Sequence, residues 1–161
     1  MSSVCDNVLF LSHPDPSRLK AAITAYKESR LLSHFDPIPT PMSPAEVAPL
    51  KLQRWGCRSD VDFRFAMEPV EMPDGSFKLV FDTPWTPPVG VYERMENAGY
   101  KVDGFYLEAG NRMAGSYGNR CDSRHTDWGN AKELPSIFAE MFDLESNFPD
   151  DYANEVNSER G

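Results

Sequence analysis

Long hydrophobic runs are missing from this sequence. Its first residues, MSSVCDNVLFLSHPDP, include no basic leader, and their apolar run extends only from Val8 to Leu11. No stretch approaches the roughly 18 apolar residues that a membrane-spanning helix needs. We therefore expect a soluble protein without a secretion signal and with no membrane among its partners.

Cysteine is also scarce. Cys5, Cys57 and Cys121 are odd in number and widely spaced. Disulfide frameworks of small secreted domains use an even number of cysteines. The pattern therefore favours reduced thiols and an intracellular protein.

Positive charge is in short supply, and the charges are unevenly distributed. The chain has 16 Lys and Arg against 25 Asp and Glu, for a net charge of −9. Residues 133–159 contain no Lys or Arg but eight acids: Glu133, Glu140, Asp143, Glu145, Asp150, Asp151, Glu155 and Glu159. Such a segment is either a solvated, solubilising end or a surface for a basic partner, including one that normally binds nucleic acid.

A glycine-rich phosphate loop is absent too. Gly110, Gly115 and Gly118 lie in EAGNRMAGSYG, a predicted hairpin rather than a junction between a strand and a helix. Cys121 and His125 form a C-x3-H pair, but no second pair accompanies it, and a structural zinc site needs four ligands. We expect neither a metal ion nor another cofactor.

Few residues could support cysteine catalysis. Cys57 lies beside Arg58, which could activate the thiol, and His125 with Asp127 could supply a base and its orienting group for Cys57 or Cys121. A lone His near an Asp is more often structural than catalytic. We therefore interpret the protein as non-enzymatic.

The chain does contain enough apolar residues for one core. At 161 residues, 40% of them hydrophobic, it has the size of a single ordinary domain. We expect a domain over residues 1–130 and a C-terminal helix with an acidic tail over residues 131–161.

The first third of the chain predicts a strand, a helix and a connector. Val4 to Ser12 is typical of a short, mostly buried strand. Asp15 can cap a helix with Pro16 at its first position, and this helix should run to about Ser29. Residues 36–49 contain five prolines and predict an extended connector without regular structure.

Alternation of apolar and polar residues between positions 61 and 81 then indicates a β-hairpin. Four apolar residues share one face of its predicted first strand: Val61, Phe63, Phe65 and Met67. Pro73-Asp74-Gly75 predicts the turn, and the alternation resumes at Phe77, Leu79 and Phe81.

The stretch DTPWTPPVG, residues 82–90, contains one tryptophan among three prolines. We predict a junction between a strand and a helix, with Thr86 as the N-cap and Pro87 at the first helical position. Trp85 precedes the cap, where apolar side chains often pack against the helix, so its predicted role is packing rather than recognition. The helix should end at Gly99.

The remaining pattern predicts two strands and a helix. Residues 102–108 and 112–118 alternate as strands around an Ala109-Gly110-Asn111 turn. Ile137, Phe138, Met141 and Phe142 have helical spacing from about Pro135. The order is β-α-β-β-α-β, so we predict an α+β, ferredoxin-like antiparallel sheet with an added C-terminal strand and helix. Its two helices would cover one face.

Four fragments, taken in order, resemble one family. They are VCDNVLFLSH at the first strand, RWGCRSD at 54–60, FDTPWTPP at 81–88 and YLEAGNRMAGSYG at 106–118. With these fragments the chain resembles the YubB-like proteins of plasmids and bacteriophages, which have a ferredoxin-like domain. Relatives tend to have an aromatic residue shortly after the Trp-Gly pair, where this chain has Ser59.

The resemblance implies a setting rather than a reaction. It implies a mobile genetic element and the cytoplasm of a bacterial host cell, and it brings no catalytic residues. By analogy, small acidic proteins in this setting often bind host machinery, including defence systems.

Our leading hypothesis is a non-enzymatic accessory protein that binds and inhibits a host protein through an acidic surface. An anti-CRISPR-like action on a defence or nucleic-acid-handling complex fits, because carboxylates can oppose a basic groove. The predicted partner-binding residues are Asp143, Glu145, Asp150, Asp151 and Trp128.

The alternative hypothesis is direct binding of RNA or single-stranded nucleic acid. RRM modules stack bases on the exposed aromatic residues of a ferredoxin-like sheet. A basic stripe beside Trp55 and Trp128 would contain Arg54, Arg58, Arg64, Arg112, Arg120 and Arg124. The sequence pI of about 4.8 opposes unaided binding to phosphates.

Overall fold

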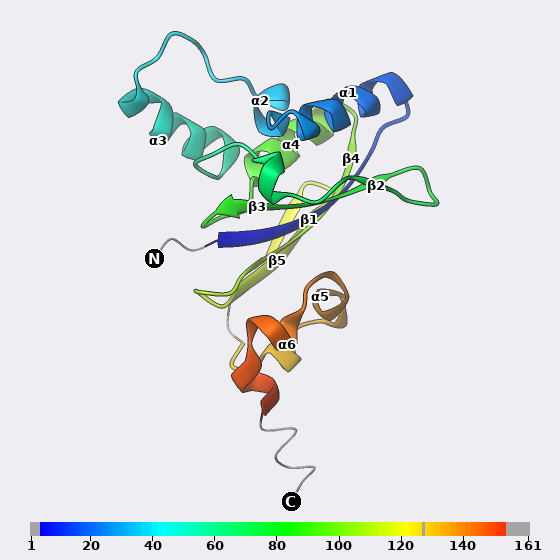
Figure 1. The fold of residues 1–161 in the computed structure, drawn as a ribbon, viewed down its shortest axis with the longest axis vertical. Coiled ribbons are helices and arrows are strands. Elements are labelled where there is room, and N and C mark those ends of the chain that lie inside the picture. The colour runs from blue at the N-terminus through cyan, green and yellow to red at the C-terminus, as the bar shows by residue number, and fades with distance from the viewer. Residues whose placement is uncertain (1–3, 127, 154–161) are drawn as a thin grey trace, which may run out of the picture.

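In the computed structural model, which describes residues 4–126 and 128–153, a six-stranded antiparallel sheet lies between two helical layers (Figure 1). The strands are β1 Val4–Ser12, β2 Val70–Glu71, β3 Phe77–Pro84, β4 Lys101–Glu108, β5 Met113–Gly118 and β6 Cys121–His125. The α-helices are α1 Pro16–Lys27, α2 Leu31–Phe35, α3 Pro44–Trp55, α4 Val89–Asn97, α5 Ser136–Met141 and α6 Leu144–Asn147. Two 3-10 helices, η1 Phe63–Phe65 and η2 Ala131–Glu133, complete the described elements.

The strand order is β2-β3-β1-β4-β5-β6, which confirms the α+β class and the antiparallel sheet. It differs from the order of a simple ferredoxin fold because β5 and β6 extend the sheet beyond β4. The central strand β1 pairs with both β3 and β4 and is mostly buried.

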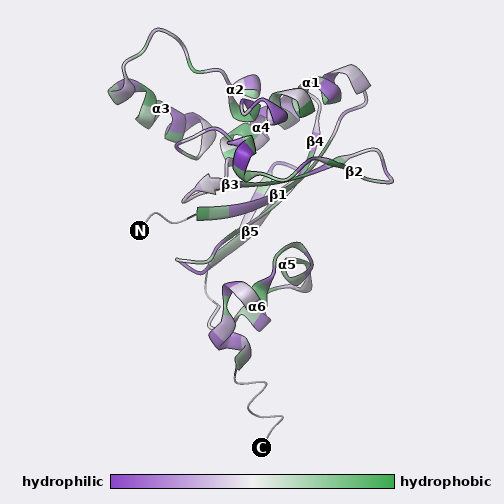
Figure 2. Ribbon diagram, in the orientation of Figure 1, coloured by the Kyte–Doolittle hydropathy of each residue, from purple (hydrophilic) through white to green (hydrophobic). Residues whose placement is uncertain are grey.

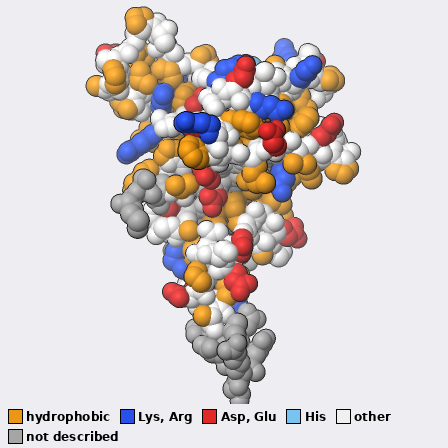
Figure 3. Space-filling model, viewed as in Figure 1, with side chains coloured by type: hydrophobic (Ala, Val, Ile, Leu, Met, Phe, Trp, Pro, Cys, Tyr) orange, Lys and Arg blue, Asp and Glu red, His pale blue; other side chains and the backbone are white. Residues whose placement is uncertain are grey.

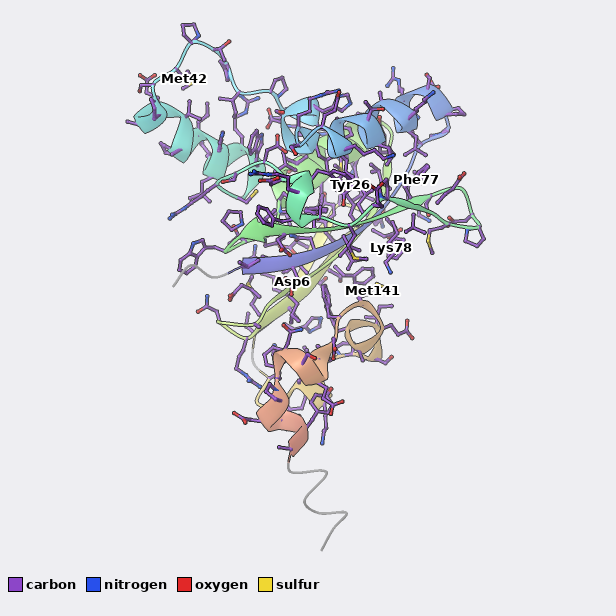
Figure 4. All side chains as sticks on the ribbon, viewed as in Figure 1. Asp6, Tyr26, Met42, Phe77, Lys78 and Met141 are labelled. Atoms are coloured by element: carbon purple, nitrogen blue, oxygen red, sulfur yellow. The ribbon has the colours of Figure 1, made fainter. Side chains whose placement is uncertain are left out.

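Helices α1 to α4 cover one face of the sheet. The predicted strand Val4–Ser12 and the cap of α1 are confirmed: Asp15 accepts a hydrogen bond from the Ser17 amide at 3.0 Å. Figure 2 shows hydrophobic and hydrophilic residues mixed along α1 and α3, as expected for helices with one side on a core. Tyr26 of α1 points at the sheet, where its hydroxyl donates to the Val80 carbonyl at 3.1 Å (Figure 4).

The expected proline connector over residues 36–49 is only partly correct, because α3 begins at Pro44. Ser43 caps this helix by accepting from the Glu46 amide, and Pro44 occupies the first turn, where a missing N–H costs nothing. Pro49 lies inside the helix. The helix ends at Gly56 in the left-handed conformation, and Trp55 is anchored by an indole N–H bond to the Asp36 carbonyl at 2.8 Å.

The predicted strand over residues 61–67 is wrong. Asp62 caps η1 by accepting from the Arg64 amide, so the chain coils here and Phe65 turns outward. Only the two residues of β2 pair with β3. The turn at residues 73–75 is confirmed, with Gly75 at φ 88°.

The predicted start of α4 is also wrong. The helix begins at Val89 with Pro88 at the N-cap, and no side chain caps it. Thr86 instead donates its hydroxyl to the Gly56 carbonyl and therefore ties this loop to the end of α3. Burial of Val91, Tyr92 and Met95 confirms the apolar stripe of the helix.

The second face of the sheet is covered by the C-terminal segment, residues 128–148. Its buried residues Phe138 and Leu144 form one cluster with Val8 of β1 and Leu107 of β4. A strand that we did not predict, β6, leads into this segment. The helix expected from about Pro135 is confirmed as α5.

Candidate interaction surface at the β3 edge

The four fragments that carry the family resemblance meet at the N-terminal end of β1. The buried Asn7 amide donates to Thr83 Oγ1 at 2.9 Å and to the Cys5 carbonyl at 3.1 Å. Thr83 donates its hydroxyl to the Thr86 carbonyl at 2.7 Å, and Thr86 continues the chain of bonds to Gly56. Buried polar groups linked in this way specify a single arrangement. The loop after β3 is therefore held in place by side chains of distant segments.

That loop presents Trp85 outward. The Thr86 amide donates to the Pro84 carbonyl at 2.7 Å, which closes a γ-turn around Trp85 at φ 67°. This positive-φ γ-turn is rare and strained, and strained backbone persists only where its surroundings enforce it. Trp85 is 42% exposed, so it is partly covered by the protein and partly open to solvent.

Exposed apolar residues concentrate along this edge of the sheet. The structure exposes six large hydrophobic side chains among the described residues. Five of them belong to the start of β1, the segment before β3 or the loop after it: Val4, Phe65, Met67, Val70 and Trp85. Phe65 is 72% exposed and Met67 is 60% exposed. Contiguous exposed apolar groups are typical of interaction sites.

A shallow depression of about 490 Å³ lies within this surface. Its apolar wall contains Val4, Phe65 and Pro84, and its polar wall contains Asp60, Asp62 and Asp82. Asp60 accepts hydrogen bonds from the amides of Leu32 and Ser33, and Asp62 pairs with Arg64. Asp82 is the exposed carboxylate of this wall.

Asp82 lies directly opposite Asp6 in the register of β1 and β3. Because alternate residues of a strand share a face, both side chains lie on the face that carries Val8 and Val80, the side of the C-terminal segment. Burial, followed by the hydrogen bond and charge of Asp82 and the charge of Glu108, raises the pKa of Asp6 to about 6. Asp6 therefore gains and loses a proton near pH 6.

The predicted partner-binding residues of the C-terminal segment divide into two groups. Asp151 accepts from Arg112 at 2.6 Å and from the Ala131 amide at 2.8 Å, and Arg112 lowers the pKa of Asp151. The Arg112 guanidinium also lies 4.6 Å from the ring centre of Trp128, which is only 8% exposed. Asp151 and Trp128 therefore hold the segment together.

Asp143 also has a local role, since its carboxylate caps α6 by accepting from the Ser146 amide at 3.1 Å. Glu140, Glu145 and Asp150 are exposed. In Figure 3, acidic side chains lie over the part of the molecule that α5 and α6 form.

The six arginines of the alternative hypothesis do not form one stripe. Arg112 and Arg120 flank opposite ends of β5. Five of the six are bound to acidic or amide side chains, in the pairs Arg54–Asp36, Arg64–Asp62, Arg112–Asp151, Arg120–Asn97 and Arg124–Asp122. Trp55 and Trp128, the expected stacking residues, are buried.

The candidate catalytic and metal-binding residues are also separated. Cys121 and His125 lie at the two ends of β6, about 13 Å apart at the rise of a strand. Burial raises the pKa of Cys57 to about 12, which keeps the thiol protonated. Asp127 lies outside the described residues. Within residues 4–126 and 128–153, no group of three His, Cys, Asp or Glu side chains is placed to hold a metal ion.

Comparison with known proteins finds no matching family model, curated protein or solved structure. The resemblance to YubB-like proteins therefore stays a prediction. None of the helices in the described part of the chain is long and apolar enough to span a membrane.

Sequence reasoning missed most of this surface. The spacing of Phe65 and Met67 predicts one apolar face of a strand, whereas both side chains are exposed beside β3. Asp6 and Asp82 come together only through the pairing of β1 with β3. The three prolines around Trp85 were the one local signal of an unusual backbone.

Proposed function

We propose that the protein is a non-enzymatic binding protein that recognises a basic surface of another protein through the outer face of its C-terminal segment. The proposed setting is that of a phage or plasmid protein that inhibits a host protein, such as a defence or nucleic-acid-handling complex. The proposed architecture is a ferredoxin-like core of β1-α1-β2-β3-α4-β4, extended by β5 and β6. The element order and the two helices on one face support it.

One observation carries this proposal: the acidic segment is an ordered layer on the sheet. Its apolar side chains, including Phe138 and Phe148, lie in the second core cluster. The carboxylates of Glu140, Glu145 and Asp150 therefore project from fixed positions. A preformed set of like charges favours fast, oriented association with a surface of opposite charge.

Nucleic acid binding through the sheet has less support. Phe10 and Phe105, the aromatic residues of the second face, pack against the cluster beneath the C-terminal segment. Bases could stack there only if this segment left the sheet. The pairing of the arginines with carboxylates also reduces their attraction for phosphates.

The test is capture of partners from a bacterial lysate by the immobilised protein. The test variant carries Glu140→Gln, Glu145→Gln and Asp150→Asn, which leaves the cap Asp143 and the anchor Asp151 intact. The control variant neutralises three exposed acids of the other layer, Glu28→Gln, Glu46→Gln and Glu93→Gln.

We expect the control variant to retain the partners and the test variant to lose them, with the loss most evident at low salt. Equal capture by both variants would contradict the proposal. A gel shift with single-stranded RNA at low salt, retained by the test variant, would favour the nucleic acid alternative instead.

A further inference from the structure

The two edges of the sheet differ in the side chains they expose. The β6 edge exposes Cys121, Asp122, Ser123 and Arg124. Charged side chains of this kind protect an edge strand against pairing with another chain. The opposite edge, formed by β2 and β3, instead exposes Val70 and, beside it, Met67 and Phe65. An apolar, exposed edge is the kind that accepts a further strand.

Part of the β3 edge lacks a neighbouring strand. β2 pairs only with Phe77 and Lys78, and one further bond joins the Met67 amide to the Val80 carbonyl at 2.9 Å. Because backbone groups of alternate residues point to the same side, the N–H and C=O of Asp82 also point away from β1. Within the described residues, nothing donates to or accepts from these two groups on that side.

The side chains around Asp82 differ on the two faces of the sheet. The helix η1, which carries Phe65, packs on the α1 side through Phe63 against Tyr26. The carboxylates of Asp82 and Asp6 lie on the other side, with Val80. An added strand would therefore meet an aromatic residue on one face and two carboxylates on the other.

The charge of the edge indicates the chemistry of its partner. Residues 59–76, which pass along this edge, contain five acids and the single base Arg64. Asp82 and Asp6 add two further carboxylates. A strand carrying Lys or Arg would complement this charge, whereas an acidic strand would be repelled.

We propose that the β3 edge is a docking site for an extended segment of a partner protein in which Lys or Arg alternates with apolar residues. The docked segment lies beside β3 in the part of the edge that β2 does not cover. There it forms hydrogen bonds with the N–H and C=O of Asp82. Its apolar side chains contact Phe65 on the α1 side, and its basic side chains contact Asp82 and Asp6 on the opposite side. Trp85, held outward by its γ-turn, lies at the end of the site without needing to reorient. The site is separate from the acidic C-terminal face.

The test uses a defined probe, an octapeptide of alternating Lys and Val with blocked ends, titrated into the full chain with ¹⁵N label. We expect shifts of the Asp82 amide and the Trp85 indole N–H. The matched octapeptide of Glu and Val should produce no such shifts. Phe65→Ser, which removes an exposed ring, should weaken binding about tenfold. Leu52→Ser is the control, because Leu52 is the sixth exposed apolar residue and lies on α3.

Three results would overturn the proposal. The Lys-Val peptide could leave the Asp82 amide unshifted at about 1 mM, where even weak binding is detected. It could shift residues of α5 and α6 instead, which would support the acidic C-terminal face alone. Finally, sedimentation could show a dimer that Phe65→Ser converts to a monomer. The edge would then serve a second copy of this chain.

Discussion

Replacement of Asp6 by Asn should stabilise the protein at neutral pH and not at acidic pH. Asp6 lies opposite Asp82 on the neighbouring strand, and its pKa is raised to about 6 from an ordinary 3.8. The folded state therefore binds a proton on this carboxyl more tightly than the unfolded state does. This contribution to stability is complete below pH 3.8 and is lost as the pH rises through about 6.

The magnitude follows from the size of the shift. A difference of one pKa unit corresponds to about 1.4 kcal/mol, so a shift of about two units sets an upper bound of about 3 kcal/mol. Asp6 is only partly buried and Asp82 is exposed, so solvent screens their repulsion. We therefore expect Asp6→Asn to gain about 1 kcal/mol in the free energy of unfolding above pH 7. Near pH 4 the gain should vanish, because wild-type Asp6 is then largely neutral in the folded state.

Urea denaturation of wild type and variant at both pH values measures this difference. The matched variant Asp82→Asn removes the same repulsion from the other side, so the double variant should gain less than the sum of the two single gains. A gain of equal size at pH 4 and pH 7.5 would refute the reasoning, since the effect would then come from packing rather than charge. A loss of stability at pH 7.5 would refute it as well.

Three further predictions test the fold. Phe138→Ala should cost about 3–4 kcal/mol in urea denaturation, because Phe138 is 1% exposed in the C-terminal cluster; a cost below about 1 kcal/mol would mean that the segment does not pack on the sheet. Ser43→Ala should cost about 1 kcal/mol by removing the cap of α3, while Ser43→Asp should not; equal losses would argue against this cap. Acrylamide should quench Trp85 more than the buried Trp55 and Trp128, and Trp85→Phe should remove this quenching; unchanged quenching would place Trp85 inside.

The elements with strong local signals were predictable from the sequence. β1 has the predicted bounds, and α1 has the predicted cap at Asp15 with Pro16 in its first turn. The hairpin of β4 and β5 was also expected, because alternating apolar and polar residues on both sides of a glycine-containing turn are typical of a β-hairpin. In each case the residues that specify the element are neighbours in the chain.

The errors arose where two local patterns competed. Pro44 is as compatible with the first turn of a helix as with an extended connector. The cap that Ser43 provides stabilises the helix. The spacing of Phe63, Phe65 and Met67 suited a strand, but the Asp62 cap coiled the chain into η1. Thr86 is a residue type that often caps helices, yet its hydroxyl donates to the carbonyl of Gly56, which is distant in sequence.

The candidate site was less predictable than the fold. The acidic character of the C-terminal segment follows directly from its composition. The helical spacing of its apolar residues can also be read from the sequence. Which carboxylates are engaged cannot be read in this way: Asp151 is bound by Arg112, which is 39 residues away in the chain. The predicted arginine stripe was wrong for the same reason, since Arg54, Arg112 and Arg120 bind side chains that lie 18 or more residues away in the chain.

By itself, the sequence determined the α+β class, the positions of β1, α1, β4 and β5, and the acidic end of the chain. These properties depend on composition and on contacts between near neighbours. Only the tertiary structure decided that the C-terminal segment covers the second face of the sheet, that Asp6 meets Asp82, and that Trp85 points outward. The physical reason is that strand pairing and the hydrogen bonds from Asn7 to Gly56 join residues that are far apart in the chain.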